Sequence, residues 1–167
     1  MAEFITVLRV KPGGKHLCLL LGEVIELWAH WVEKEKQSAA CIGSGCRFCP
    51  GERKWRGYLP VIQYQGMDTS IARPVPRYVK AILEIGPNAM QVLSQRDYVG
   101  LEQVFLRDKN RFSALEVQTP KHGRVLPDIP SWDIRPAIMR MWGLSSLDQV
   151  IDDSVPDVIP FRKREVS

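Results

Sequence analysis

The amino-acid sequence predicts a mainly β protein that also contains helices. Two observations support this class. Short segments in which apolar and polar residues alternate are bounded by turns rich in glycine, proline and asparagine, and helical patterns occur only between and after the later segments. Apolar residues form 45% of the 167-residue chain and charged residues 25%, which is enough apolar material for a core. Short strands with hairpins and a helix between the later strands favour a small β-barrel of the OB type, with an SH3-like barrel or a sheet decorated with a zinc ribbon as alternatives.

The expected strands follow one another along the chain. In order, they are residues 4–10, 16–21, 23–32, 57–65, 77–85, 101–107 and 111–117. The turn at 11–15 predicts a hairpin between the first two, and the turn at 108–110 predicts another between the last two. Residues 23–32 also fit a helical stripe, but their β-branched and aromatic content favours a strand, in which Trp28 and His30 share one face.

Loops and helices complete the expected organisation. Residues 33–40 are polar and predict a loop, while Pro60 restricts its strand to an edge or a bulge of the sheet. Helices are predicted at 86–95 and at 132–142, where Gly143 ends the second helix. The chain therefore divides into an OB-like β domain with an inserted loop at 30–51, a connector with the C-terminal helix, and a flexible tail: residues 1–118, 119–151 and 152–167.

A cluster of cysteines is the most informative motif. Cys41, Cys46 and Cys49 fall within nine residues, and His30 precedes them. A Cys-x2-Cys pair on a glycine-flanked turn lets two thiolates reach one ion from the same side, and the other two residues complete a tetrahedral set. Zinc favours these ligands, and four protein ligands leave no open position. We therefore expect a structural zinc ion that braces the loop.

Two alternatives to this site remain open. In the first, Cys18 replaces His30 in an all-cysteine site, although Cys18 lies in an apolar strand where a buried thiol acts as a small hydrophobic group. His30 is favoured because its proximity in sequence to Cys41 lowers the cost of loop closure. The second alternative is a set of free cysteines or a redox-active pair, but the redox function needs a thioredoxin-like βαβ context that the sequence does not show.

A basic and aromatic run follows the cysteine cluster. The formal net charge is only +4, but between residues 47 and 80 seven cations are opposed by only Glu52 and Asp68. Cations neutralise phosphates and aromatic rings stack on unpaired bases, so this combination is typical of single-stranded nucleic acid binding. The candidate residues of the run are Arg47, Phe48, Arg53, Lys54, Trp55, Arg56 and Tyr58. Trp55 and Tyr58 also fit positions in the core.

Two further segments are candidates for the same ligand. The first is a loop and strand with Arg73, Arg77, Tyr78 and Lys80, and the second is a hairpin turn with Lys109, Arg111 and Phe112. Hairpin loops flank the binding face of an OB barrel, so the turn can contact a bound strand. An exposed hairpin tip is polar in any case, and solvation explains this turn equally well.

Signatures of catalysis and of membrane insertion are absent from the sequence. It contains no nucleophile elbow, no Walker-type phosphate loop and no dinucleotide-binding fingerprint, so we expect a non-catalytic protein. No apolar run reaches membrane-spanning length, the N-terminus lacks the pattern of a signal peptide, and clustered cysteines without a disulfide framework are typical of a reducing compartment. We therefore expect a cytoplasmic protein with no membrane partner.

The spacing His30-x10-Cys41-x4-Cys46-x2-Cys49 on a β-rich chain resembles the zinc-bearing core of the single-stranded-DNA-binding proteins of T-even phages. In that family one histidine precedes three cysteines, and the zinc loop braces an OB fold lined with basic and aromatic residues. The resemblance implies zinc as cofactor and single-stranded DNA as ligand. It is specific over this motif only, and the gap between Cys41 and Cys46 is shorter here. The acidic stretch at 148–157 is similar to the acidic tails that recruit replication partners, but here basic residues follow it.

Together these features predict a zinc-stabilised single-stranded-DNA-binding protein that acts in replication or recombination, in a phage or mobile element. An alternative of a different class is a zinc-braced adaptor that binds a protein partner through the predicted C-terminal helix. The apolar residues of that helix, Trp132, Met139, Met141 and Trp142, also fit a core. A module that binds RNA is a third alternative, which differs in its sensitivity to the 2′-hydroxyl group.

Overall fold

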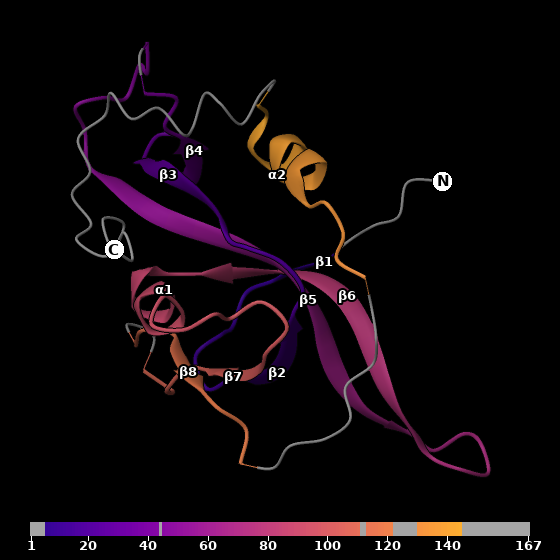
Figure 1. The fold of residues 1–167 in the computed structure, drawn as a ribbon. Helices are drawn as coiled ribbons and strands as arrows, with labels where there is room; N and C mark the ends of the chain where they lie inside the picture. The colour runs from indigo at the N-terminus through magenta and orange to yellow at the C-terminus, as the bar shows by residue number, and fades with distance from the viewer. Residues whose placement is uncertain (1–5, 44, 111–112, 122–129, 145–167) are drawn as a thin grey trace.

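The computed structural model describes residues 6–43, 45–110, 113–121 and 130–144 of the chain (Figure 1). These residues form an eight-stranded sheet and two short helices, so the predicted mainly β class is confirmed. In chain order, the elements are β1 (Thr6–Leu8), β2 (Lys15–Leu20), β3 (Ile25–Val32), β4 (Gln37–Ala40), β5 (Arg53–Asp68), β6 (Val75–Ile85), α1 (Pro87–Leu93), β7 (Glu102–Leu106), β8 (Glu116–Gln118) and α2 (Arg135–Trp142). Neither helix is long and apolar enough to cross a membrane, within the part of the chain that is described.

Two long antiparallel strands, β5 and β6, form the centre of the sheet (Figure 1). The strand order is β1-β6-β5-β2-β7-β8, and β3 branches from β5 and pairs with β4. β3 pairs with residues 53–58 of β5 and β2 pairs with residues 61–63, so these two partners occupy successive parts of one edge. Among the described strands, the pairings leave the sheet open, and they do not establish the closed barrel that the sequence predicts.

The first predicted hairpin is wrong, and the second is confirmed. β1 pairs with β6 in parallel, whereas β2 lies between β5 and β7. β2 pairs with β5 through residues 18–20 and with β7 through residues 15–19, so long-range pairing replaces the local hairpin. The glycine turn instead contacts the β7–β8 connection, where the N–H group of Gly13 donates to the carbonyl oxygens of Arg107 and Asp108, both at 3.0 Å. β7 and β8 pair as antiparallel neighbours, as the sequence predicts, but β8 covers Glu116–Gln118 in place of the predicted 111–117, and the connection is longer than the predicted turn at 108–110.

Two expectations about individual strands are corrected. The sequence predicts a loop at 33–40, but residues 37–40 form β4, because pairing with β3 supplies hydrogen bonds that the small and polar side chains do not signal. Pro60 lies in the central strand β5 and not at an edge. The carbonyl oxygen of Pro60 accepts a hydrogen bond from the N–H group of Leu21 at 2.9 Å, so the proline nitrogen faces the same edge of β5. Along this edge the pairing of β5 with β3 stops at Tyr58 and its pairing with β2 starts at Val61. A missing N–H group is tolerated at such a change of partner.

The sheet carries a hydrophobic core on each face. Trp28, Trp55 and Phe105 pack on one face together with residues of α1. Leu27 and Tyr58 pack on the other face together with residues of α2. The neighbours Trp28 and Leu27 thus point to opposite faces, as the alternation predicted for this strand requires. The helix expected after Gly86 is also confirmed, and it covers the first of these cores.

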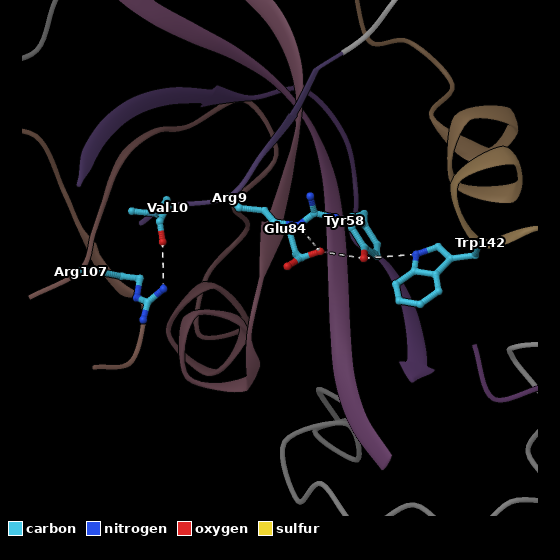
Figure 2. Close-up of polar contacts among 6 residues, drawn as sticks. All are labelled: Arg9, Val10, Tyr58, Glu84, Arg107 and Trp142. Atoms are coloured by element: carbon cyan, nitrogen blue, oxygen red, sulfur yellow. Dashed lines mark hydrogen bonds and ion pairs between the residues drawn. The ribbon is translucent and has the colours of Figure 1, made fainter. Parts of the chain in front are cut away.

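A chain of hydrogen bonds joins α2 to the sheet (Figure 2). The hydroxyl group of Tyr58 donates to Glu84 Oε2 (2.8 Å) and accepts from Trp142 Nε1 (3.2 Å). Arg9 Nε lies 3.3 Å from the same carboxylate oxygen. The helix ends where the sequence predicts, because Gly143 adopts the left-handed conformation with a φ of 65°. The predicted tail at 152–167 lies outside the described residues.

Candidate metal centre and adjoining groove

Four candidate metal ligands come together where β3, β4 and β5 meet. His30 lies in β3, Cys41 directly follows β4, and Cys46 and Cys49 lie in the turn that leads into β5. Their ligand atoms all lie within 4.8 Å of one another. Gly45 has a φ of 80°, a conformation that glycine adopts without strain and that lets the loop fold back toward the histidine. The sheet thus assembles the ligand set that the sequence predicts.

The distances within the cluster fit a small tetrahedral ion. Cys41 Sγ lies 3.5 Å from Cys49 Sγ. His30 Nε2 lies 3.5 Å from Cys46 Sγ and 3.6 Å from Cys49 Sγ. A zinc ion with ligand distances of about 2.0–2.3 Å in tetrahedral geometry requires neighbouring ligand atoms about 3.5–3.8 Å apart. The donor atoms and these three spacings therefore fit zinc.

The environment of His30 supports its function as a ligand, in preference to Cys18. His30 is 2% exposed, and its Nδ1 lies 2.9 Å from the backbone carbonyl oxygen of Glu52. The Nδ1–H group donates to that oxygen, which leaves the lone pair on Nε2, the atom that faces the thiols. Metal-bound histidines commonly have such a backbone partner. Cys18 is fully buried in the first core, where burial, followed by the charge of Glu102, raises the pKa of its thiol to about 12.

The electrostatics of the cysteines favour a bound cation. Burial opposes ionisation of Cys46, but hydrogen bonds from the backbone at Phe48 and Ile42 outweigh it and lower the pKa of this thiol to about 6. The hydrogen bond with Cys41, followed by burial, raises the pKa of Cys49 to about 11. Adjacent thiols cannot all ionise together without a cation. A divalent ion among them removes this conflict, because thiolates are its ligands.

Three residues of the basic and aromatic run face the interior. Trp55 is 2% exposed in the first core, and Tyr58 is fully buried in the second. Because their rings present no face to a base, the core interpretation replaces the stacking interpretation for both. The guanidinium carbon of Arg53 lies 4.4 Å from the ring centroid of Trp28, and its Nη1 lies 3.9 Å from Cys41 Sγ. Arg53 therefore packs beside the metal cluster.

A groove beside the metal cluster gathers Phe48, Lys54 and Arg56 of the run around an aromatic side chain that the sequence analysis did not select. This hollow of about 420 Å³, called here the metal-side groove, is lined by Trp31, Phe48, Lys54 and Arg56, together with Glu52 and smaller residues. Lys54 lies opposite Ala29 and Arg56 lies opposite Leu27, two β3 residues on the same face of the sheet as Trp31. Because directly opposed residues share a face, both cations lie on the face of Trp31. Trp31 is 57% exposed. The sequence did contain a signal for this exposure: Trp31 follows Trp28 by three residues, and in a strand residues three apart point to opposite faces.

The remaining candidates lie elsewhere on the surface. The guanidinium carbon of Arg47 lies 4.7 Å from the ring centroid of Phe48, but Arg47 itself does not line the groove. Two exposed cations, Arg73 and Arg77, and the half-buried Tyr78 lie on the far part of the β5–β6 hairpin. The exposed Lys80 lies opposite Ile62, where β5 also pairs with β2. Lys109 is exposed at the β7–β8 turn, while the candidates Arg111 and Phe112 lie outside the described residues. The structure therefore divides the predicted nucleic-acid contacts into separate groups.

Comparison of this chain with models of protein families, with curated proteins and with solved structures finds no match.

Proposed function

We propose that this chain is a zinc-stabilised, non-catalytic protein that binds single-stranded DNA during replication or recombination. The observation that carries the proposal is the metal-side groove, in which the exposed ring of Trp31 lies on the same face as Lys54 and Arg56. The proposal includes an OB-like sheet as the scaffold, zinc as the bound metal and DNA as the ligand.

The chemistry of the groove matches the two parts of a single strand. Lys54 is exposed and Arg56 is half-buried, so both cations can approach phosphates along the rim. The ring of Trp31 offers a face for one base, and stacking of this kind contributes on the order of 1–3 kcal/mol per base whatever its identity. In a duplex the bases are already paired and stacked, which favours an unpaired strand as the ligand of this groove.

The metal cluster has a structural role in this proposal. Phe48 lies between Cys46 and Cys49 in sequence, and its ring centroid is 5.8 Å from that of His30. An ion held by the cysteines and the histidine therefore fixes the wall of the groove that carries Phe48. A closed site with four protein ligands supplies folding energy and leaves no position for a reacting molecule.

The adaptor hypothesis has less support from the fold. Ile134 and Ile138 of the C-terminal region are buried, and Trp132, Met139, Met141 and Trp142 pack against the same core. These apolar side chains pack within the chain, whereas a docking helix needs its apolar side chains at the surface. RNA remains the competing nucleic acid, and the binding experiment distinguishes it.

Fluorescence anisotropy with labelled oligo-dT tests the proposal. Trp31→Ala is expected to weaken binding by about 5–150-fold, the equivalent of 1–3 kcal/mol, whereas Trp31→Phe retains a stacking face and most of the affinity. Val99→Ala, which trims another exposed apolar side chain away from the groove, is the matched control. Matched single-stranded RNA and blunt duplex serve as competitors. The proposal fails if the zinc-loaded protein has no affinity for oligo-dT at low salt, or if Trp31→Ala and Val99→Ala bind alike.

A further inference from the structure

The far part of the β5–β6 hairpin is a two-stranded ribbon outside the body of the sheet. The pairing of β5 with β2 ends at Gln63, while its pairing with β6 continues to Asp68 and Val75. In Figure 1 this ribbon projects away from the other elements and ends in the loop at 69–74. Residues 64–78 are called here the β5–β6 arm.

The surface of the arm is basic and apolar. Met67 is 47% exposed, Ile71 in the tip is 50% exposed and Val75 is 45% exposed. Arg73 in the tip and Arg77 on β6 are exposed cations. The only acidic residue in the arm's sequence is Asp68, whose Oδ1 accepts hydrogen bonds from the N–H and hydroxyl groups of Ser70. Exposed apolar side chains gathered on one projecting segment are typical of an interaction surface, and the neighbouring cations favour an anionic partner.

We propose that the β5–β6 arm binds duplex DNA by inserting its tip into the major groove of the double helix. A two-stranded ribbon, with strands about 4.8 Å apart, fits the major groove, which is about 12 Å wide and 8.5 Å deep. Five residues of β5 extend the arm by up to about 16 Å, a length that exceeds the depth of the groove. Arg73 and Arg77 contact phosphates, and Ile71 contacts base edges.

A second copy of the chain fits the arm less well. Self-association through two arms places Arg73 and Arg77 of each copy near those of the other, and like charges repel at such an interface. DNA supplies the opposite charge along the whole length of the arm. Charge complementarity therefore selects the duplex as the occupant.

The arm and the metal-side groove lie at opposite ends of β5. Arg56 of the groove and Met67 of the arm are 11 positions apart in the sequence. At about 3.3 Å per residue a regular strand of this length spans about 36 Å, and the irregularity between Tyr64 and Met67 shortens it, so the two sites lie within about one turn of DNA. One molecule can therefore hold a single strand in the groove and the adjoining duplex with the arm. The preferred ligand is then a junction between single-stranded and double-stranded DNA, and this part of the inference rests on the proposed function.

The test compares three labelled probes with the zinc-loaded full-length protein: oligo-dT, a blunt duplex, and the same duplex with the oligo-dT as a tail. The double variant Arg73→Ala/Arg77→Ala is matched by Arg96→Ala/Lys121→Ala, which removes two exposed cations outside the arm. Each phosphate contact contributes about eightfold to affinity at about 0.1 M salt through counterion release. The arm variant is therefore expected to bind both duplex probes about 60-fold more weakly, and to lower the slope of log affinity against log salt by about two.

Several results overturn the inference. It is wrong if the wild-type protein binds the tailed duplex no more tightly than oligo-dT, or if the arm variant loses oligo-dT and duplex affinity equally. It is also wrong if Ile71→Ser converts a dimer to a monomer in sedimentation without changing duplex binding, because the arm is then an interface between copies. Failure of the proposed function gives a different pattern: arm-dependent binding of the blunt duplex persists, while oligo-dT does not bind.

Discussion

Replacement of Cys49 by serine isolates the contribution of the metal to the stability of the fold. The side chain of Cys49 is exposed, so the loss of its sulfur removes little packing. The substitution removes one of the four ligands whose atoms lie within 4.8 Å of one another. Its cost should therefore appear only when the metal is present.

The expected magnitude follows from mass action. With free zinc at about 1,000 times its dissociation constant, binding stabilises the folded state by about 4.1 kcal/mol. For a chain of this size, 1 kcal/mol shifts the melting temperature by about 2–4 °C. If Cys49→Ser no longer binds zinc at that concentration, its melting temperature lies about 8–16 °C below that of the wild type. In excess chelator, the melting temperatures of the two proteins should differ by no more than about 2 °C.

Thermal unfolding with and without chelator, combined with metal analysis of the purified chain, measures these quantities. Cys18→Ala is the control, because Cys18 is fully buried in the first core and outside the metal cluster. This variant is expected to keep its zinc and to lose the same stability with or without chelator. The reasoning is refuted if the deficit of Cys49→Ser persists in chelator, or if Cys18→Ala loses its metal.

Two further predictions concern the scaffold. Tyr58→Phe removes the hydroxyl group that joins Glu84 to Trp142, and the unpaired groups are expected to cost about 1–3 kcal/mol of unfolding free energy, measured by urea titration. Increased hydrogen exchange confined to α2 locates the effect, and uniform exchange across the sheet contradicts it. Burial lowers the pKa of His16, whose Nδ1 lies 2.9 Å from the side-chain amide of Gln63. Because the unfolded chain takes up the proton first, His16 contributes stability above its ordinary pKa of 6.5 that is lost as the pH falls below that value. His16→Gln in chelator should therefore show a smaller loss of stability on acidification, and an unchanged pH profile rules this out.

Local patterns were sufficient to place most of the secondary structure. Alternation at 77–85 and the first-turn proline at Pro87 predicted β6 and α1, and Gly143 predicted the end of α2. The pairing partners of the strands were harder to predict from the sequence. The glycine turn at 11–15 suggested a hairpin, but β1 pairs with β6 instead, more than seventy residues away in sequence. Such long-range pairing depends on which edges other strands occupy, and no local pattern records it.

The candidate site shows the same division. The cysteine spacing and the upstream histidine identified the ligand set, because the reach of a short loop and the donor atoms needed by zinc are local properties. The choice between His30 and Cys18 was decided by the fold, which buries Cys18 in a core and turns His30 Nε2 toward the thiols. Both residues are in β-strands, so their distance from the loop depends on how β3 and β2 pair with β5.

From the residues alone, one can read a mainly β chain, a metal-ligating loop and an excess of positive charge in the middle of the sequence. Which aromatic side chains reach the surface was decided only by the tertiary structure: Trp55 and Tyr58 are buried, and Trp31 is exposed beside Lys54. The physical reason is that a sheet covered on both faces buries side chains that point to either face. Alternation along a strand then separates the two faces, but the position of α1, α2 and the metal loop determines where each face is open.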